Sequence, residues 1–114
     1  MPYLKIQTNR NIDHATQQEV LKQASALVAN SIGKSEQYVM TTFDPIQPMT
    51  FAGSDEPCAY LELKSIGLSE SKTAALSMAL CKFIETSLEV PANRVYIEFA
   101  DAPRAMWGWN KGTF

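Results

Sequence analysis

Hydrophobic and polar residues follow one another in two distinct periods along the first third of this chain. Residues 3–8 alternate between apolar and polar side chains, which is typical of a β-strand with one buried face. Apolar residues then recur at intervals of three and four and predict the buried side of a helix. These residues are Val20, Leu21, Ala24, Leu27, Val28 and Ile32. Residues 16–19 match a capping box and predict the start of this helix, and Gly33 predicts its end.

The second half of the chain repeats this order. Residues 38–43 are rich in strand-forming side chains and predict a second strand, and residues 59–63 and 95–99 predict two more. Between the last two lies a second helical pattern, for which Ser69 is the expected N-cap and Pro91 the stop. Its apolar positions are Leu76, Ala79, Leu80, Phe83, Ile84 and Leu88.

This repetition predicts an α+β fold in a single domain over residues 1–114, with pseudo-repeats at residues 2–45 and 58–103. Two tandem β-α-β units with right-handed crossovers give a four-stranded mixed sheet with two antiparallel helices on one face. The other face stays uncovered and is expected to carry enough apolar side chains to need a cover. Residues 49–51 and 107–114 remain as short edge strands that can pair with a neighbouring copy, so we expect a homo-oligomer.

Composition narrows the function classes. With 46% hydrophobic and 19% charged residues the chain is typical of a globular protein rather than a disordered one. The net charge of −2 and the pI near 5.3 give no electrostatic footprint for nucleic acid. No apolar stretch is long enough for a membrane span, and no signal peptide is recognisable. We therefore expect a cytoplasmic protein, which can be secreted only by a route that needs no signal peptide.

Few residues are available for conventional catalysis. His14 is the single histidine and lies in a polar stretch at the expected helix start, which disfavours a Ser-His or Cys-His site. Cys58 and Cys81 lie far apart and no cluster of residues has the spacing of metal ligands, so a zinc site is not expected and both thiols are interpreted as small buried hydrophobes. Acid–base chemistry, if the protein is an enzyme, must use another group.

Pro2 is open to two interpretations. Proline cannot donate a ladder hydrogen bond, but it is tolerated as the first residue of a strand. If Met1 is removed, however, the Pro2 nitrogen becomes a secondary amine of the α-amino class, whose unperturbed pKa is about 7.7 to 8. Burial or a nearby cation lowers such a pKa and yields a general base near neutral pH. If Met1 is retained, the same nitrogen is an amide without useful basicity.

Several short motifs, in order along nearly the whole chain, resemble one family. They are Met1-Pro2, Gly33-Lys34 with Gln37-Tyr38, Ser54-Asp55-Glu56-Pro57-Cys58-Ala59, Ser65-Ile66-Gly67, Arg94-Val95-Tyr96-Ile97, and Gly108-Trp109-Asn110 with Thr113-Phe114. Together they resemble the macrophage migration inhibitory factor (MIF) family of the tautomerase superfamily. The resemblance implies a homotrimer with active sites between subunits and a tautomerase that needs no cofactor and no metal. Pro2 would interconvert keto and enol forms of an aryl pyruvate such as phenylpyruvate, or rearrange a dopachrome-like compound.

The resemblance also implies roles for individual residues. Lys34 would pair with the substrate carboxylate and help to lower the pKa of Pro2. The backbone N–H of Ile66 would donate to the same carboxylate, with Ser65 beside it and Gly67 permitting close backbone approach. The alternative for Lys34 is a solvated lysine after a helix end, where its positive charge complements the helix dipole.

Aromatic residues would form the rest of the pocket. Tyr96 would reach in from the neighbouring subunit, and the walls would be Tyr38, Trp109 and Phe114. Such walls suit an aryl substrate, although packing at a subunit interface is the alternative reading of each ring.

Three residues depart from the better-known animal members of the family. Glu98 replaces an asparagine near the pocket, where its charge can repel a carboxylate or raise the pKa of Pro2. Trp107 replaces a small branched residue and is expected to narrow the pocket mouth. Leu61 occupies the second position of a C-x-x-C motif, so thiol–disulfide activity is not expected.

The alternative to an enzyme is a MIF-like cytokine or signalling ligand with a vestigial or weak tautomerase site. Animal members of the family act as cytokines, and a protein receptor is the partner that this alternative requires. Nothing in the sequence marks a receptor-binding surface.

Overall fold

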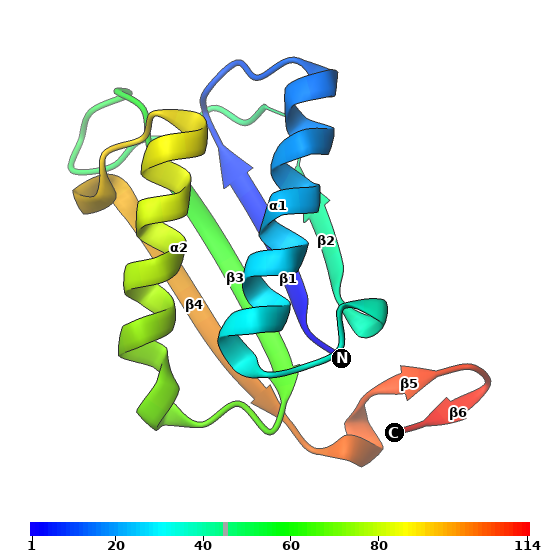
Figure 1. The fold of residues 1–114 in the computed structure, drawn as a ribbon. Coiled ribbons are helices and arrows are strands. Elements are labelled where there is room, and N and C mark those ends of the chain that lie inside the picture. The colour runs from blue at the N-terminus through cyan, green and yellow to red at the C-terminus, as the bar shows by residue number, and fades with distance from the viewer. Residues whose placement is uncertain (45) are drawn as a thin grey trace.

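Four strands form one mixed sheet, and two helices cover one of its faces (Figure 1). The computed structural model describes residues 1–44 and 46–114. The elements are β1 (Tyr3–Thr8), α1 (His14–Ile32), β2 (Met40–Phe43), β3 (Ala59–Ile66), α2 (Thr73–Leu88), β4 (Val95–Ala102), β5 (Gly108–Trp109) and β6 (Gly112–Thr113). None of the helices in this described part is long and apolar enough to cross a membrane.

The predicted tandem arrangement is confirmed. The strand order is β2-β1-β3-β4, with β1 parallel to β2 and β3 parallel to β4. The two β-α-β units meet where β1 and β3 pair in antiparallel register, from Tyr3 opposite Lys64 to Thr8 opposite Ala59. Both helices lie on the same side of the sheet and run in opposite directions (Figure 1). The α+β fold class therefore follows from the two hydrophobic periods in the sequence.

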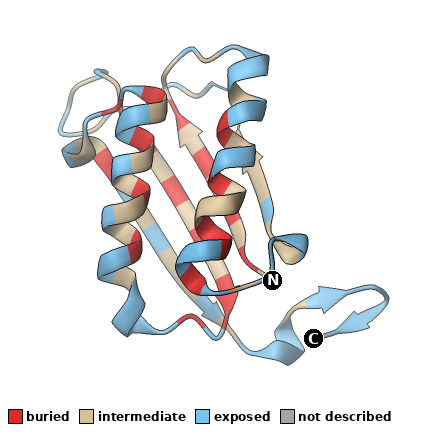
Figure 2. Ribbon diagram, viewed as in Figure 1, coloured by how far each residue is buried: buried red, intermediate tan, exposed pale blue. Residues whose placement is uncertain are grey.

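The hydrophobic core fills the layer between the helices and the sheet. Alternate residues of the central strands point into it, and the predicted apolar stripes of both helices face them (Figure 2). The largest fully buried side chains of this layer are Leu4, Ile6, Leu61, Leu63, Val28, Leu80, Ile84 and Leu88. One polar side chain, Thr8, is buried at the end of β1, where its hydroxyl donates to the Cys58 carbonyl at 2.7 Å.

The opposite face of the sheet differs from the prediction. Its side chains are mainly tyrosines and charged groups rather than the apolar residues expected to need a cover; they include Tyr3, Lys5, Tyr60, Glu62, Lys64, Tyr96 and Glu98. Lys5 pairs with Asp44 at 3.5 Å and with Glu62 at 3.9 Å. Strand alternation sends the aliphatic residues to the helix side and leaves this polar set behind. Hydrophobic burial alone is therefore no argument for association through this face.

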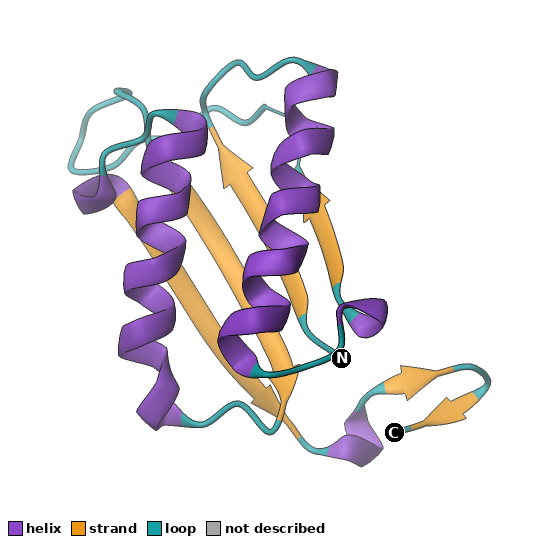
Figure 3. Cartoon of the chain, viewed as in Figure 1, coloured by secondary structure: helices purple, strands orange, loops and turns teal. Residues whose placement is uncertain are grey.

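Element starts depart from the sequence prediction in three places. The N-cap of helix α1 is Asp13, three residues before Thr16, because the Asp13 carboxylate accepts the Thr16 backbone N–H at 2.6 Å. Tyr38 belongs to a 3₁₀ turn, Glu36–Tyr38, that precedes the shorter strand β2 (Figure 3). Ser69 caps another such turn, Glu70–Lys72, and α2 follows it.

The helix ends agree with the prediction, whereas the expected edge strands do not. The end of α1 at Gly33 is confirmed, since Gly33 has the left-handed φ of 69° that favours glycine. Helix α2 ends at Leu88, before Pro91, through a left-handed Glu89. Residues 49–51 form no strand; Phe51 only bridges to Ser54 across a turn. The C-terminal residues do form strands, but β5 and β6 pair with each other as a hairpin.

The cap of α1 can be tested by substitution. Asp13→Ala is expected to lower the melting temperature at pH 7, whereas Thr16→Ala is expected to change it much less. The hydrogen bonds from Thr16 hold the pKa of Asp13 below its ordinary value of 3.8. The stabilisation is therefore complete above that pH and disappears as the pH falls through the lower folded-state pKa. Thermal unfolding of both variants at pH 7 and at acidic pH measures this, and a larger loss from Thr16→Ala would contradict the assignment.

Candidate functional site

A cavity of about 410 Å³ opens where the start of β1 meets the turn before β2 and the C-terminal hairpin. The N- and C-terminal ends of the chain both lie in this region (Figure 1). The cavity is lined by Met1, Pro2, Tyr3, Gln37, Tyr38, Val39, Met40, Lys64, Trp107, Gly108, Trp109 and Phe114. Five of the residues that the sequence proposed for the site therefore meet at one place, namely Pro2, Tyr38, Trp107, Trp109 and Phe114.

Pro2 is fully buried and lines this cavity. It stands one residue before β1, and its carbonyl accepts the Met40 backbone N–H at 2.9 Å. This bond continues the pairing with β2 and fixes the Pro2 backbone. The structural interpretation, in which Pro2 directly precedes a strand, therefore agrees with the fold. Its place in the cavity is also what a catalytic Pro2 would need, because a base must reach a bound substrate.

The electrostatic environment at this chain end disfavours a protonated amine. The pKa of the Met1 amine lies below its ordinary value of 8.0, chiefly because of burial and secondly because of the positive charge of Lys34. Both causes act on any ammonium group held at this position. An amine here is therefore more often neutral at pH 7 than an exposed chain terminus.

Lys34 is held beside the cavity by the end of α1. The left-handed turn at Gly33 allows the Lys34 backbone N–H to donate to the Ala29 carbonyl at 3.0 Å, as in a Schellman motif. Lys34 is half-buried and does not line the cavity, although its charge lowers the pKa of the Met1 amine. Within the described residues, no carboxylate forms an ion pair with Lys34. Its charge is therefore available to an anionic ligand.

Three aromatic rings form one wall of the cavity. The Tyr38 ring meets Trp109 edge-on, with centroids 5.7 Å apart, and meets Phe114 in the same way at 5.8 Å. Trp109 and Phe114 stack at 5.1 Å with planes only 18° apart. Such edge and stacked contacts are favourable beyond the area they bury. They fasten the C-terminal hairpin against the turn that precedes β2.

The hairpin has its own local supports. Asn110 and Lys111 connect β5 and β6 with φ values of 50° and 69°, which is the geometry of a tight hairpin turn. The Phe114 backbone N–H donates to the Trp107 carbonyl at 3.2 Å, and Arg104 Nε donates to the Phe114 carbonyl at 3.2 Å. These hydrogen bonds hold Trp107 and Phe114 at the cavity.

Lys64 is a lining residue that the sequence reasoning missed. It is half-buried on β3, opposite Tyr3 in the antiparallel register, and so comes next to the chain end. Its alternation within residues 59–66 places it on the side away from the core, but the sequence does not reveal which residue it faces across the sheet. The site therefore has a second lysine besides Lys34.

Ser65 and Ile66 are buried and do not line the cavity. The Ser65 hydroxyl donates to the Ile66 carbonyl at 3.3 Å. Gly67 follows with a left-handed φ of 72°, and a Cβ added there would contact nothing within 4 Å. Within the chain, the positive φ rather than a close approach is what favours glycine at this position.

Tyr96 and Glu98 lie on β4, on the uncovered face of the sheet, and do not line the cavity either. Tyr96 is 65% exposed and packs against Phe51 with ring centroids 4.9 Å apart. Glu98 is exposed opposite Glu62 in the parallel register of β3 and β4. Burial, followed by the charges of Glu98 and Glu62, raises the pKa of Tyr60 above its ordinary value.

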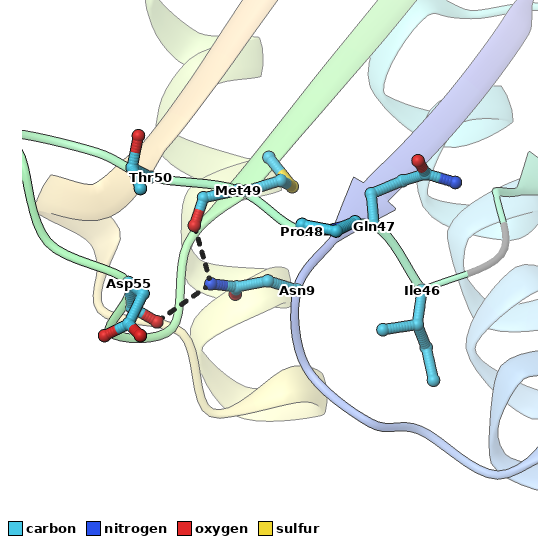
Figure 4. A pocket seen from close by; sticks show the side chains of 7 residues that line it. All are labelled: Asn9, Ile46, Gln47, Pro48, Met49, Thr50 and Asp55. Carbon is cyan, nitrogen blue, oxygen red and sulfur yellow. Dashed lines mark hydrogen bonds between the residues drawn. The ribbon is translucent and has the colours of Figure 1, made fainter.

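A larger cavity, of about 600 Å³, lies among loops away from these residues. Figure 4 shows it between Asn9, residues 46–50 and Asp55. The Asn9 amide donates to the backbone carbonyls of Met49 at 3.4 Å and Asp55 at 3.1 Å, so this polar group serves the loop. No residue proposed from the sequence lines this cavity, and the smaller one is the better candidate.

The residues suited to metal or thiol chemistry stay apart. No group of three His, Cys, Asp or Glu in the part of the chain that the structure describes can hold a metal ion. Cys58 is buried and Cys81 half-buried, and both are free thiols, as expected. His14 is exposed at the first residue of α1.

Comparisons with known proteins agree on one family. The family model described as macrophage migration inhibitory factor (MIF) matches residues 1–114. A macrophage migration inhibitory factor homolog of Brugia malayi is 39% identical over 115 residues, covering 100% of this chain and 99% of the relative. Macrophage migration inhibitory factor of Mus musculus is 35% identical over 108 residues, covering 93% and 94%.

Solved structures share the fold over nearly the whole chain. The crystal structure of a macrophage migration inhibitory factor homologue from Prochlorococcus marinus has a TM-score of 0.92 and 42% identity, covering 98% of both chains. The corresponding protein of Toxoplasma gondii has a TM-score of 0.91 and 33% identity, covering 98% of this chain and 99% of its own.

Proposed function

Because the chain belongs to the macrophage migration inhibitory factor family, we propose that it is a cofactor-independent keto–enol tautomerase of the phenylpyruvate tautomerase or L-dopachrome isomerase type. The general base is the amine of Pro2 after removal of Met1. The observation that carries this proposal is the burial of Pro2 in a cavity whose surroundings lower the pKa of a terminal amine. A neutral, buried amine is a competent base near pH 7.

Removal of Met1 transfers the chain terminus to a more buried residue. With Met1 in place, Pro2 is fully buried and Met1 is partly buried, and burial is the larger cause of the lowered Met1 pKa. The amine of Pro2 is therefore expected to have a pKa below the range of about 7.7 to 8 that exposed termini show. Its ring also fixes the direction of the lone pair, which points a single base at the substrate.

The reaction moves one proton between carbon and oxygen. In enolisation, the Pro2 nitrogen takes a proton from the carbon next to the keto group, and the electron pair of that C–H bond becomes the carbon–carbon double bond. The carbonyl oxygen gains negative charge and accepts a proton, which gives the enol and leaves the Pro2 ammonium to release its own. Ketonisation is the reverse. No oxidant or reductant takes part.

The lining supports an aryl substrate that bears a carboxylate. The stacked rings of Trp109 and Phe114, with Tyr38 against them, offer flat apolar surface for an aromatic group. Lys34 and Lys64 supply positive charge on two sides of the chain end. Phenylpyruvate combines these two features. Trp107 lines the cavity and is proposed to restrict how large the aryl group can be.

The remaining proposed residues require a neighbouring subunit. We propose a homotrimer in which Tyr96 of one subunit completes the site of the next, since Tyr96 is exposed and lies outside the cavity of its own chain. The Ile66 backbone N–H, with Ser65 beside it, is proposed to bind the carboxylate. Glu98 shares a strand with Tyr96 and is proposed to weaken carboxylate binding or to raise the pKa of Pro2.

Substitution of the base tests the proposal directly. Protein whose loss of Met1 is confirmed by mass, and whose trimeric state is confirmed by sedimentation, is expected to tautomerise phenylpyruvate. Pro2→Gly, which is also processed, is expected to lose about 100-fold or more in kcat/KM, because a positioned base contributes at least that much. Unfolding curves of both proteins check that the fold is intact.

The same pair of proteins separates the enzyme from the signalling ligand. An unchanged kcat/KM in Pro2→Gly would contradict the proposal. A processed trimer without turnover, or a receptor-mediated activity that survives Pro2→Gly undiminished, would favour the ligand instead.

Lys34→Ala is expected to change both substrate binding and pH dependence. Loss of the cation raises KM for phenylpyruvate by several-fold or more, because a charge-assisted contact is removed. It also relieves the charge repulsion on the Pro2 ammonium, so the pKa of Pro2 rises and the acid limb of kcat/KM moves to higher pH. Lys22→Ala, at an exposed position of α1, is the control. Identical pH profiles for the Lys34 variant and the wild type would remove Lys34 from the site.

A further inference from the structure

The loop between β2 and β3 is held by side chains instead of by regular structure. Its residues 46–58 cross one end of the molecule with only turns and one isolated bridge, between Phe51 and Ser54 (Figure 3). From one side, Asn9 donates to the carbonyls of Asp55 and Glu56 and accepts the Cys58 backbone N–H at 2.9 Å. From the other side, Arg94 reaches into it from the residue just before β4. Two residues far apart in the sequence thus set the shape of this loop.

Arg94 uses its whole guanidinium group for this purpose. Nε donates to the Pro57 carbonyl at 2.9 Å, and Nη1 donates to the Phe51 carbonyl at 3.1 Å. Nη2 donates to the carbonyls of Ser54 at 3.1 Å and Glu56 at 3.0 Å. Within the described residues no carboxylate forms an ion pair with Arg94, so its guanidinium group interacts with backbone oxygens instead. A planar five-donor group suits four converging carbonyls, whereas lysine offers only a point charge.

The same guanidinium group also packs against a ring of the loop. Its central carbon lies 5.2 Å from the centroid of the Phe51 ring, within the range of a cation–π contact. The Phe51 ring in turn contacts Tyr96, with centroids 4.9 Å apart and planes at 61°. Arg94 and Tyr96 are two residues apart and the buried Val95 lies between them, so both point to the side away from the core. Phe51 therefore connects the two side chains.

This contact is unusual for a side chain as exposed as Tyr96. A tyrosine that is 65% exposed ordinarily exchanges between rotamers, because little surrounds it. Here the Tyr96 ring makes an edge contact with Phe51, which is itself held by Arg94 through its carbonyl and its ring. The rest of the Tyr96 ring remains free for a partner.

We propose that Arg94 is a positioning residue, which holds Phe51 against Tyr96 and thereby fixes the direction in which Tyr96 reaches the active site of a neighbouring subunit. This inference rests on the proposed function, because it assigns to Tyr96 a substrate in an adjoining subunit. Arg94 itself touches no substrate. Its effect passes through one ring, Phe51, and is confined to the binding of the aryl group, since the base is Pro2.

Five variants, one of them Tyr96→Ala alone as the reference, and one control test the coupling. Phe51→Leu removes the ring but keeps an apolar side chain, and Arg94→Lys keeps the charge but loses the planar donors. Each is made alone and together with Tyr96→Ala, and KM and kcat for phenylpyruvate are measured on trimeric protein. Arg10→Lys is the control, because Arg10 Nε also donates to a backbone carbonyl, that of Leu88 at 3.0 Å, but this carbonyl belongs to the C-terminal end of α2 and not to the loop.

The proposal predicts a change in KM that depends on Tyr96. Phe51→Leu and Arg94→Lys are expected to raise KM by about two- to tenfold, the size of one aromatic contact, with little change in kcat. In the Tyr96→Ala background the same substitutions are expected to have no further effect on KM. Arg10→Lys is expected to leave KM unchanged, whatever its effect on the melting temperature. An equal rise in KM with and without Tyr96 would overturn the proposal and reduce Arg94 to a loop anchor.

A measurement independent of turnover separates this proposal from the proposed function. The chain has four tyrosines, so NMR signals of ¹³C-labelled tyrosine are few and Tyr96 is assigned with Tyr96→Phe. Phe51→Leu and Arg94→Lys are expected to move the Tyr96 signals toward rotamer-averaged values and to leave those of Tyr38 in place. Unchanged Tyr96 signals would overturn the positioning role. If the two variants show averaged Tyr96 signals but the unsubstituted protein has no turnover, the positioning of Tyr96 by Arg94 is supported and the proposed function is rejected.

Discussion

The antiparallel pairing of β1 with β3 is the constraint on which the other features of this molecule depend. It joins two β-α-β units into one sheet, sends the aliphatic residues of both strands into a single core and leaves a polar face on the other side. Its register, which sets Tyr3 opposite Lys64, also fixes the chain end beside a cation. A shift by one residue would move Leu4 out of the core and Lys64 into it, so the fold and the candidate site are specified together.

The candidate site combines a buried chain end with a wall supplied by the other end of the chain. Pro2 is fixed by its carbonyl bond to Met40, while the C-terminal hairpin returns Trp109 and Phe114 to Tyr38. Burial lowers the pKa of an amine there and Lys34 lowers it further. The proposed mechanism therefore needs no conventional acid–base side chain, which is consistent with a chain whose only histidine is exposed on α1.

Periodicity in the sequence predicted the strands, helices and their order because burial against one core decides all of them. It did not locate the start of α1, where Asp13 and Thr16 both suit a cap and only the tertiary path selects Asp13. The aromatic wall came from the resemblance to the family, which also favoured one of the two interpretations that the sequence offered for Pro2. Lys64 and the role of Arg94 were beyond sequence reasoning, since strand register and backbone carbonyl acceptors leave no mark in the residue pattern.

The state of the Pro2 nitrogen is the central claim, and an NMR titration tests it most directly. Protein labelled with ¹⁵N-proline, with Met1 removed, gives a terminal-amine signal whose shift follows protonation. The account predicts a pKa below the range of about 7.7 to 8 of exposed termini, because Pro2 is buried and Lys34 is near. A pKa at or above that range would contradict it.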